Sequence, residues 1–272
     1  MYWGWAKLSS YNLRAQAGYQ AQRGHWTKSS VAIGQRRAPA PEGRAGFIRI
    51  DSVHQGDFDG CKGLYHINAV DCVTQFELVA SCERISEAYL LPVLGCLLED
   101  FPFVILGFHA DNGSEYINHT VAKLLTKLHI EFTKSRPRTS NDNALAETKN
   151  AAIVRKHLGY AHIPQRCAAE VNVFCREALN PYVNFHRPCF FPTSVTDSKG
   201  RMRKHYRFED MMTPYEKLKS LPNAKGFLKP GMSFAALDAY VAATSDNQAA
   251  QRMNEARARL FQSIQRRSKQ VA

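Results

Sequence analysis

Residues 101–116 read FPFVILGFHADNGSEY, an apolar run followed by a polar and acidic one. Its apolar first half predicts a short strand over 104–108 that is buried on both faces, as strands of parallel sheets are. Asp111 follows this strand, and Asn112 and Gly113 permit a sharp turn there. Open α/β sheets place their ligands just beyond the carboxyl ends of such strands. Asp111 is therefore the first candidate for a functional carboxylate.

A second carboxylate lies in residues 141–150, which read NDNALAETKN. Thirty-five residues separate Glu147 from Asp111. The pattern predicts a helix from Ala144 to about Tyr160, with Asn143 as its N-cap. Glu147 would then lie in the first helical turn, where the positive end of the helix dipole favours the ionised carboxylate.

The third candidate is Asp51, at the end of the run GFIRI over 46–50. In a strand, Ile48 and Ile50 would face one side of the sheet, whereas Arg49 and Asp51 would face the other. An aspartate on a central strand can bridge two metal ions, and we expect Asp51 to have that role.

Each of these carboxylates also has an ordinary interpretation as a turn former or a solvated surface acid. Asp57, Asp59 and Asp71 compete with Asp51 for its role. The first two fall in an expected hairpin loop, and Asp71 ends an expected strand, where it would cap a turn. Taken singly, the ordinary interpretations are preferable. Taken jointly, on three elements in the right order, the functional interpretation is favoured.

The expected elements follow the order βββαβαβα. We predict strands over 47–53, 63–70, 74–80, 104–108 and 130–133, and helices over 86–99, about 117–128 and 144–160. This order indicates an α/β fold with a ribonuclease-H-like mixed five-stranded sheet: three antiparallel strands, two parallel ones, and helices on both faces. Its first and fourth strands are adjacent, which brings Asp51 beside Asp111. The last helix then crosses this position and delivers Glu147.

Four regions are expected along the chain: a basic N-terminal remnant and linker (1–45), a catalytic core (46–165), an irregular region (166–232) and a helical basic tail (233–272). A short basic helix is expected over 11–26. A hairpin is expected between 184–191 and 201–208, and a helix start at Thr213. An apolar stripe on the tail predicts docking on this or another subunit; it consists of Ala249, Met253, Ala256, Leu260 and Ile264.

The formal charge of +12 and the pI near 9.5 favour a polyanionic partner, of which nucleic acid is the commonest. No segment approaches the ~20 apolar residues of a membrane-spanning helix, and the N-terminus does not resemble a signal peptide. The seven cysteines are scattered and never spaced C-x-x-C, which argues against a zinc site and for reduced thiols in the cytoplasm.

Three carboxylates of this kind suit phosphodiester chemistry. Two divalent ions about 3.5–4 Å apart can activate the nucleophile and stabilise the leaving oxygen. Hard Mg²⁺ or Mn²⁺ prefers carboxylate oxygen. We therefore expect Asp51, Asp111 and Glu147 to be both the catalytic residues and the ligands of two such ions.

The two motifs and their interval resemble the D,D-35-E core of retroviral-type integrases, and most closely the integrase-core transposases of bacterial insertion sequences. The resemblance covers about 47–160 and extends more loosely over 180–188 and 213–218. It implies magnesium-dependent cleavage at element ends, attack of the freed 3′ hydroxyl on double-stranded target DNA, a homo-oligomer on that DNA, and a nucleoid-associated protein in the bacterial cytoplasm. Such transposases carry a helix-turn-helix region before the core, and about 45 residues are too few for it.

The loop from residue 134 to 141 leads into the Glu147 helix, and its basic side chains are expected to bind phosphates. The DNA-contacting set is predicted to be Lys134, Arg136, Arg138, Asn143, Lys149, Arg155 and Lys156. A second basic block over 199–207 is equally compatible with DNA contact and with a solvated hairpin.

Two other functions compete with an insertion-sequence transposase. One is a ribonuclease-H-like nuclease that hydrolyses DNA without strand transfer, because the same metals can activate water. The other is an inactive, N-terminally truncated DNA-binding remnant of a transposon.

Overall fold

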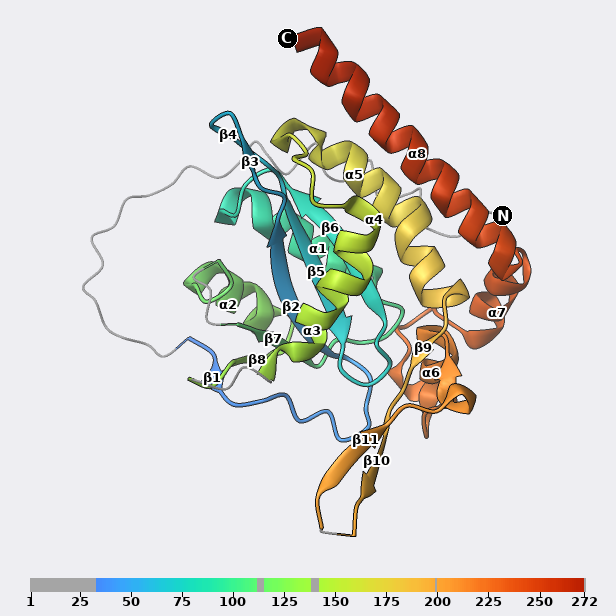
Figure 1. The fold of residues 1–272 in the computed structure, drawn as a ribbon. Helices are drawn as coiled ribbons and strands as arrows, with labels where there is room; N and C mark the ends of the chain where they lie inside the picture. The colour runs from blue at the N-terminus through green and yellow to red at the C-terminus, as the bar shows by residue number, and fades with distance from the viewer. Residues whose placement is uncertain (1–32, 112–114, 138–141, 199, 272) are drawn as a thin grey trace, which may run out of the picture. The chain divides into compact units, whose positions relative to one another are not determined.

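The central sheet has six strands in the order β1-β8-β7-β2-β5-β6 (Figure 1). The computed structural model describes residues 33–111, 115–137, 142–198 and 200–271; for 268–271 it describes the backbone alone. The strands are β1 (Gln35–Arg36), β2 (Phe47–His54), β5 (Tyr65–Asp71), β6 (Glu77–Cys82), β7 (Gly107–Ala110) and β8 (Glu131–Lys134). The chain is thus a mixed α/β protein.

Strands β2, β5 and β6 are antiparallel, whereas β7, β8 and β1 continue the sheet in parallel from β2. This confirms the expected adjacency of the first and fourth predicted strands. The arrangement of these five strands is consistent with a ribonuclease-H-like core. The prediction of five strands was short by one, because Gln35 and Arg36 in the expected linker pair with Thr133 and Lys134. A two-residue edge strand has no side-chain pattern that a sequence could reveal.

Helices cover both faces of the sheet (Figure 1). One core contains buried leucines of α1 (Glu87–Asp100) and α2 (His119–Lys127), packed against Ile48 and Ile50 of β2. Later helices α6 (Pro214–Ser220) and α7 (Phe234–Ala242) add to the same core. The alternation of β2 therefore divides its side chains between the two faces as predicted, since Val53 belongs to the opposite core.

The opposite core lies under the helix that follows β8. This helix begins as α3 (Ala144–Lys149), widens into a π-helical segment (Asn150–Arg155) and ends as α4 (Lys156–Leu158). Its extent agrees with the predicted 144–160, but the π-helical segment was not predicted. Asn143 occupies the N-cap position as expected, yet its side chain makes no capping hydrogen bond.

The next helical stretch contains α5 (Ala168–Phe174) and π-helical segments Cys175–Leu179 and Tyr182–His186, preceded by a 3-10 turn, Gln165–Cys167. Extended structure was expected from residue 184, and this was wrong. Pro181 normally ends a helix because it lacks an N–H, but here it lies between the two wide π-helical segments and the helix continues.

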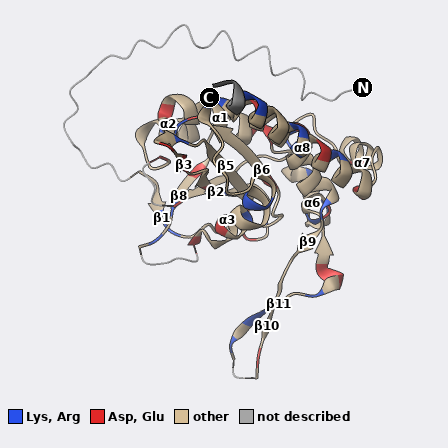
Figure 2. Cartoon of the chain, turned by 45° about the horizontal axis from the view of Figure 1, so that its top comes forward, with Lys and Arg blue, Asp and Glu red and all other residues tan. Residues whose placement is uncertain are grey.

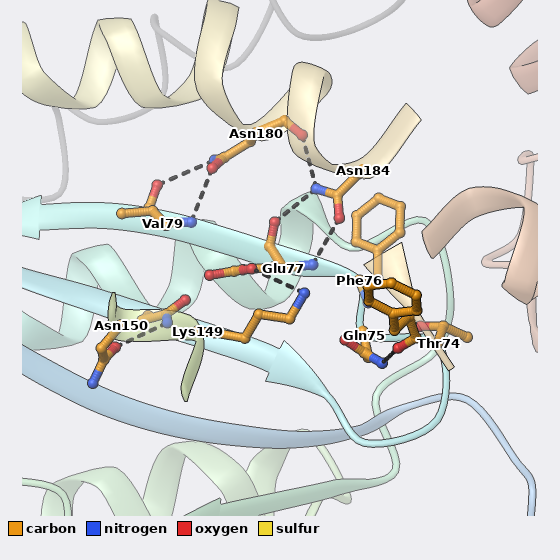
Figure 3. Close-up of polar contacts among 11 residues, drawn as sticks. Thr74, Gln75, Phe76, Glu77, Val79, Lys149, Asn150, Asn180 and Asn184 are labelled. Carbon is orange, nitrogen blue, oxygen red and sulfur yellow. Dashed lines mark hydrogen bonds and ion pairs between the residues drawn. The ribbon is translucent and has the colours of Figure 1, made fainter. Parts of the chain in front are cut away.

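Three asparagines of this stretch pair with the outer edge of β6. Asn172 exchanges hydrogen bonds with the backbone of Ser81 at 2.6 and 2.8 Å, and Asn180 does so with Val79 at 2.9 and 3.1 Å. Asn184 pairs with the backbone of Glu77 at 2.7 and 2.6 Å; the latter two pairs are visible in Figure 3. The amides satisfy the N–H and C=O groups that an edge strand otherwise leaves open. We call these residues the asparagine ladder.

The C-terminal part contains a hairpin of β10 (Thr193–Thr196) and β11 (Met202–His205). The expected hairpin is thus present, but its first strand is not within 184–191. Short pairs β3 (Asp57–Phe58) with β4 (Cys61–Lys62), and β9 (Cys189–Phe190) with β12 (Met211–Met212), complete the strands; 3-10 turns cover Phe208–Asp210 and Ala224–Phe227. The predicted helix start at Thr213 is confirmed by a capping box with Glu216.

The tail is the helix α8 (Asp246–Val271), as predicted. Met253, Leu260 and Ile264 of its apolar stripe are buried in the second core against α5 and the π-helical segments. The described residues from Ile33 onward form one unit, and the predicted internal boundaries stay predictions. The expected helix over 11–26 lies outside the described residues. Within the described part, no helix is both long and apolar enough to cross a membrane.

Candidate active site

The register of β2 and β7 places Asp51 and Asp111 at the same end of the sheet centre. Ile50 of β2 is the parallel partner of Ala110 of β7. Asp51 and Asp111 are the residues that directly follow this pair. Asp51 is half-buried on β2, and Asp111 is exposed just beyond the last residue of β7. Asp111 thus follows a buried parallel strand as predicted, but this strand covers Gly107–Ala110 instead of 104–108, and Val104 is exposed.

Glu147 lies in the first turn of α3, which packs against β2 and β5. Its side chain is exposed. The start of this helix is tied to the sheet by Asn143, whose Nδ2 donates to the carbonyl oxygen of Ile50 at 3.1 Å. Because Ile50 directly precedes Asp51, this bond holds the beginning of the Glu147 helix beside the central aspartate.

The three carboxylates interact electrostatically. Burial raises the pKa of Asp51, and the negative charges of Glu147 and Asp111 raise this pKa further. Hydrogen bonds from the backbone of Ser52 and from Asn150 act in the opposite direction. Carboxylates from a strand, a strand end and a helix therefore lie within reach of one another's charge.

Asn150 orients Asp51, and sequence reasoning missed this residue. Its Nδ2 donates to Oδ2 of Asp51 at 2.7 Å, while its Oδ1 accepts from Nδ2 of Asn68 on β5 at 2.9 Å. The other oxygen of Asp51 accepts from the backbone N–H of Ser52 at 2.8 Å. The available signal was the spacing, because Asn150 follows Glu147 by three residues and so shares its helical face.

The donor set matches hard divalent cations in its chemistry, since Mg²⁺ and Mn²⁺ prefer carboxylate oxygen. In the described part of the chain, however, no three His, Cys, Asp or Glu side chains are grouped closely enough to hold a metal ion. The structure thus places Asp51 and Asp111 one residue after paired positions on adjacent strands, but the described residues do not present a closed coordination site. The two-ion site remains a proposal.

The competing aspartates have the ordinary roles expected for them. Asp57 and Asp59 are exposed at the β3–β4 hairpin. Asp71 is buried and accepts hydrogen bonds from the backbone N–H groups of Gly46 (2.8 Å) and Thr74 (2.8 Å), among others. It caps the turn between β5 and β6, as predicted.

Two of the basic loop residues serve the fold. Lys134 is buried, and its Nζ donates to the carbonyl oxygen of Ile33 at 2.6 Å. Arg136 is exposed but binds Asp142 through Nε (3.0 Å) and Nη2 (2.8 Å), a bidentate pair that holds the pKa of Asp142 down at about 2. The predicted phosphate contact of Lys134 is disfavoured, because the residue is buried and its Nζ is bound to the carbonyl oxygen of Ile33. Arg138 lies outside the described residues.

The helix from Ala144 to Leu158 has fewer exposed candidates for DNA contact than predicted. Asn143 is buried under Ile50, as described above, and does not reach the surface. Arg155 donates to the carbonyl oxygen of His54 at 2.9 Å and lies over the ring of Tyr160, so it ties the end of β2 to the helix. Lys156 is exposed, and it stays in the proposed DNA-contacting set together with Arg136.

Lys149 was also predicted to contact DNA, but the structure gives it a buried partner within the chain. Its side chain is only 9% exposed, and its Nζ lies 3.7 Å from Oε2 of the buried Glu77 (Figure 3). Burial raises the pKa of Glu77 to about 7, although the charges of Lys149 and Arg187 lower it. Lys149 therefore balances a buried acid beneath the active-site helix.

Comparison with known proteins adds little. No family model matches this chain. The curated "Uncharacterized protein y4rM" of Sinorhizobium fredii is 26% identical over 205 residues, and the match spans 73% of this chain and 57% of that protein's length. A solved structure, the catalytic core domain of BIV integrase in crystal form I, is similar with a TM-score of 0.39 and 14% identity, over 64% of this chain and 95% of that chain.

Proposed function

We propose that this chain is an integrase-type polynucleotidyl transferase, a transposase that cleaves DNA at insertion-sequence ends and joins the freed 3′ ends to target DNA. One geometric observation carries the proposal: Asp51 and Asp111 follow the paired residues Ile50 and Ala110 on adjacent strands, and the helix of Glu147 is tied to Ile50 through Asn143. In this proposal, carboxylates from three separate elements form the site: Asp51 within β2, Asp111 just after β7 and Glu147 in α3. The net charge of +12 supports a polyanionic substrate.

The residues of the chain have distinct roles in this proposal. Asp51 is held by Asn150 and by the backbone of Ser52, so its two oxygens are oriented before the substrate binds. Asp111 and Glu147 are exposed and face the incoming phosphodiester. Mutual repulsion among three carboxylates favours the capture of cations at this place. Two Mg²⁺ or Mn²⁺ ions, when bound, would neutralise charge on the phosphate and activate the attacking oxygen.

The first experiment measures nicking of supercoiled plasmid by the full chain in Mg²⁺ and in Mn²⁺. We expect metal-dependent nicking that Asp51→Asn, Asp111→Asn and Glu147→Gln each abolish, while DNA binding is largely retained. Asp57→Asn is the matched control, because it removes an exposed carboxylate from the β3–β4 hairpin and should leave nicking unchanged. A variant that still nicks DNA removes its residue from the proposed triad.

A second experiment separates transfer from hydrolysis, because the same carboxylates could activate water. DNA fragments with free 3′ hydroxyls, cut from both flanks of the gene, are incubated with the protein and a circular target. Fragments joined to the target support a transposase. Hydrolysis products alone would make the chain a nuclease, and DNA binding without either product would make it an inactive remnant.

A further inference from the structure

The β10–β11 hairpin extends away from the sheet as an arm (Figures 1 and 2). All four residues of β11 are exposed, and three of the four residues of β10 are exposed as well. An isolated two-stranded hairpin gains little stability by itself. An arm that buries so little of its surface in its own chain is well placed to bind a partner.

The arm concentrates positive charge. Residues 193–207 hold five lysines or arginines and one acid, Asp197. A stretch of 15 residues thus carries a net +4 of the chain's +12. Asp197 pairs with Arg203, and Arg207 near the base of the arm pairs with Glu209 and Asp210. Within the described part of the chain, Arg201 and Lys204 have no acidic side-chain partner.

Both faces of the ribbon carry cations. The cross-strand pairs Val195–Arg203 and Ser194–Lys204 are consecutive, so their side chains point to opposite faces. The exposed apolar residues are also divided between the two faces. Met202 pairs with Thr196 on one face, and Val195 pairs with Arg203 on the other. Neither face is a continuous apolar surface of the kind on which a second copy would dock.

We propose that the β10–β11 hairpin is a DNA-binding arm that enters the major groove of the duplex. The major groove admits a two-stranded β-ribbon and is flanked by phosphates on both sides, which suits a ribbon with cations on both faces. The inference rests on the proposed function for the choice of DNA as the polyanion. It adds a second contact area, on an element separate from the carboxylates.

Fluorescence anisotropy with a 30-base-pair duplex tests this arm in EDTA, where no metal-dependent cleavage occurs. The variant Arg201→Ala/Lys204→Ala is compared with Lys62→Ala/Lys225→Ala, which removes two exposed cations elsewhere. We expect the arm variant to bind on the order of tenfold more weakly, and its slope of log affinity against log salt to fall by about 2. The control variant should bind like the wild type.

Equal affinity and equal salt dependence for both double variants would overturn the proposal. The charge-conserving variant Lys204→Arg should bind DNA like the wild type. In the wild-type chain, bound DNA should protect Lys204 from acetylation, and an unprotected Lys204 would also overturn the proposal. Light scattering that detects a dimer lost in the arm variant, without an effect on DNA, would assign the arm to self-association instead. Since binding is measured without cleavage, nicking activity and arm binding can fail independently.

Discussion

At the scale of single residues, the clearest arrangement is the chain of side chains from Asn68 through Asn150 to Asp51. A carboxylate on a strand has several rotamers, and the hydrogen bond from Asn150 selects one of them. Residues that orient metal-binding carboxylates typically change metal affinity or activity by 10–100-fold when they are removed. Asn150 is thus a positioning residue for the proposed reaction.

We expect Asn150→Ala to lower nicking activity and Mn²⁺ affinity on the order of tenfold, because Asp51 loses its orienting donor. Isothermal titration with Mn²⁺ measures the affinity without requiring cleavage. Asn254→Ala, at an exposed position on α8, serves as the control. Unchanged Mn²⁺ affinity in Asn150→Ala would show that this hydrogen bond does not prepare the site.

The buried pair of Glu77 and Lys149 predicts a pH effect. The pKa of Glu77 rises from 4.5 to about 7 on folding, because burial disfavours its charged form. The folded state therefore holds this proton more tightly, and the stabilising contribution is present below pH 4.5 and lost as the pH rises to about 7. Glu77→Gln removes this titration.

Between pH 4.5 and 7, the stability of the wild type relative to Glu77→Gln should fall with rising pH, by on the order of 3 kcal/mol at most. Urea unfolding of both proteins at several pH values measures this difference. A difference in unfolding free energy that stays constant across this range would show that Glu77 is ionised throughout.

Local sequence determines where the aspartates lie, whereas the surroundings of the lysines and arginines depend on distant residues. The aspartates could be ranked because their roles depend on local position: after a strand, in a hairpin, or at a turn. The burial of Lys149 and Asn143 could not be predicted, because their side chains bind Glu77 and the carbonyl group of Ile50. These partners come from strands far away in the sequence.

At the scale of elements, the asparagine ladder joins the second helical layer to the edge of the sheet. Each amide satisfies one donor and one acceptor of β6, so the edge strand is closed without a further strand. Removing a side chain that pairs with buried backbone groups typically costs about 1–3 kcal/mol.

We expect Asn180→Ala and Asn184→Ala each to lower the unfolding free energy by about 1–3 kcal/mol in urea titrations, because buried backbone groups lose their partners. The backbone amide of Val79 should also exchange faster with solvent in Asn180→Ala. The exposed Asn247 provides the control, and its alanine variant should change stability by less than about 0.5 kcal/mol. Equal stabilities of all three variants would refute a structural role for the ladder.

Long periodic elements were predicted well, and elements defined by long-range pairing were not. The predicted helix over 86–99 agrees with α1 to within about a residue at each end, because its apolar spacing is a local property. The tail expected over 233–272 is helical too, but it is divided into α7 and α8. By contrast, β1 exists only through its pairing with β8. The π-helical segments were not predicted either, since they have the same apolar faces as α-helix in the local sequence.

At the scale of the whole molecule, α8 completes the second core. Met253, Leu260 and Ile264 pack with residues of β2, the active-site helix and α5. The tail therefore stabilises the same layer of helices that contains Glu147. Sequence predicted the docking face of this helix but left open whether the acceptor was this chain or another.

We expect Leu260→Ala to cost about 2–5 kcal/mol, because it leaves a cavity between α8 and the rest of the core. Gln262→Ala, on the exposed face of the same helix, should change stability by less than about 0.5 kcal/mol. Urea unfolding of the wild type, followed by circular dichroism and by tyrosine fluorescence, should give the same transition with both probes. Separate transitions for the two probes would show that α8 is not part of the cooperative unit.

We propose that Asp51, Asp111 and Glu147 together hold two divalent cations. Crystals soaked in Mn²⁺ and measured by anomalous diffraction should show two manganese peaks about 3.5–4 Å apart, with Asp51 contacting both and with Asp111 and Glu147 as further ligands. Crystals of Asp51→Asn should lose both peaks. Saturating Mn²⁺ that gives no peak at Asp51, or peaks only elsewhere on the molecule, would contradict the account.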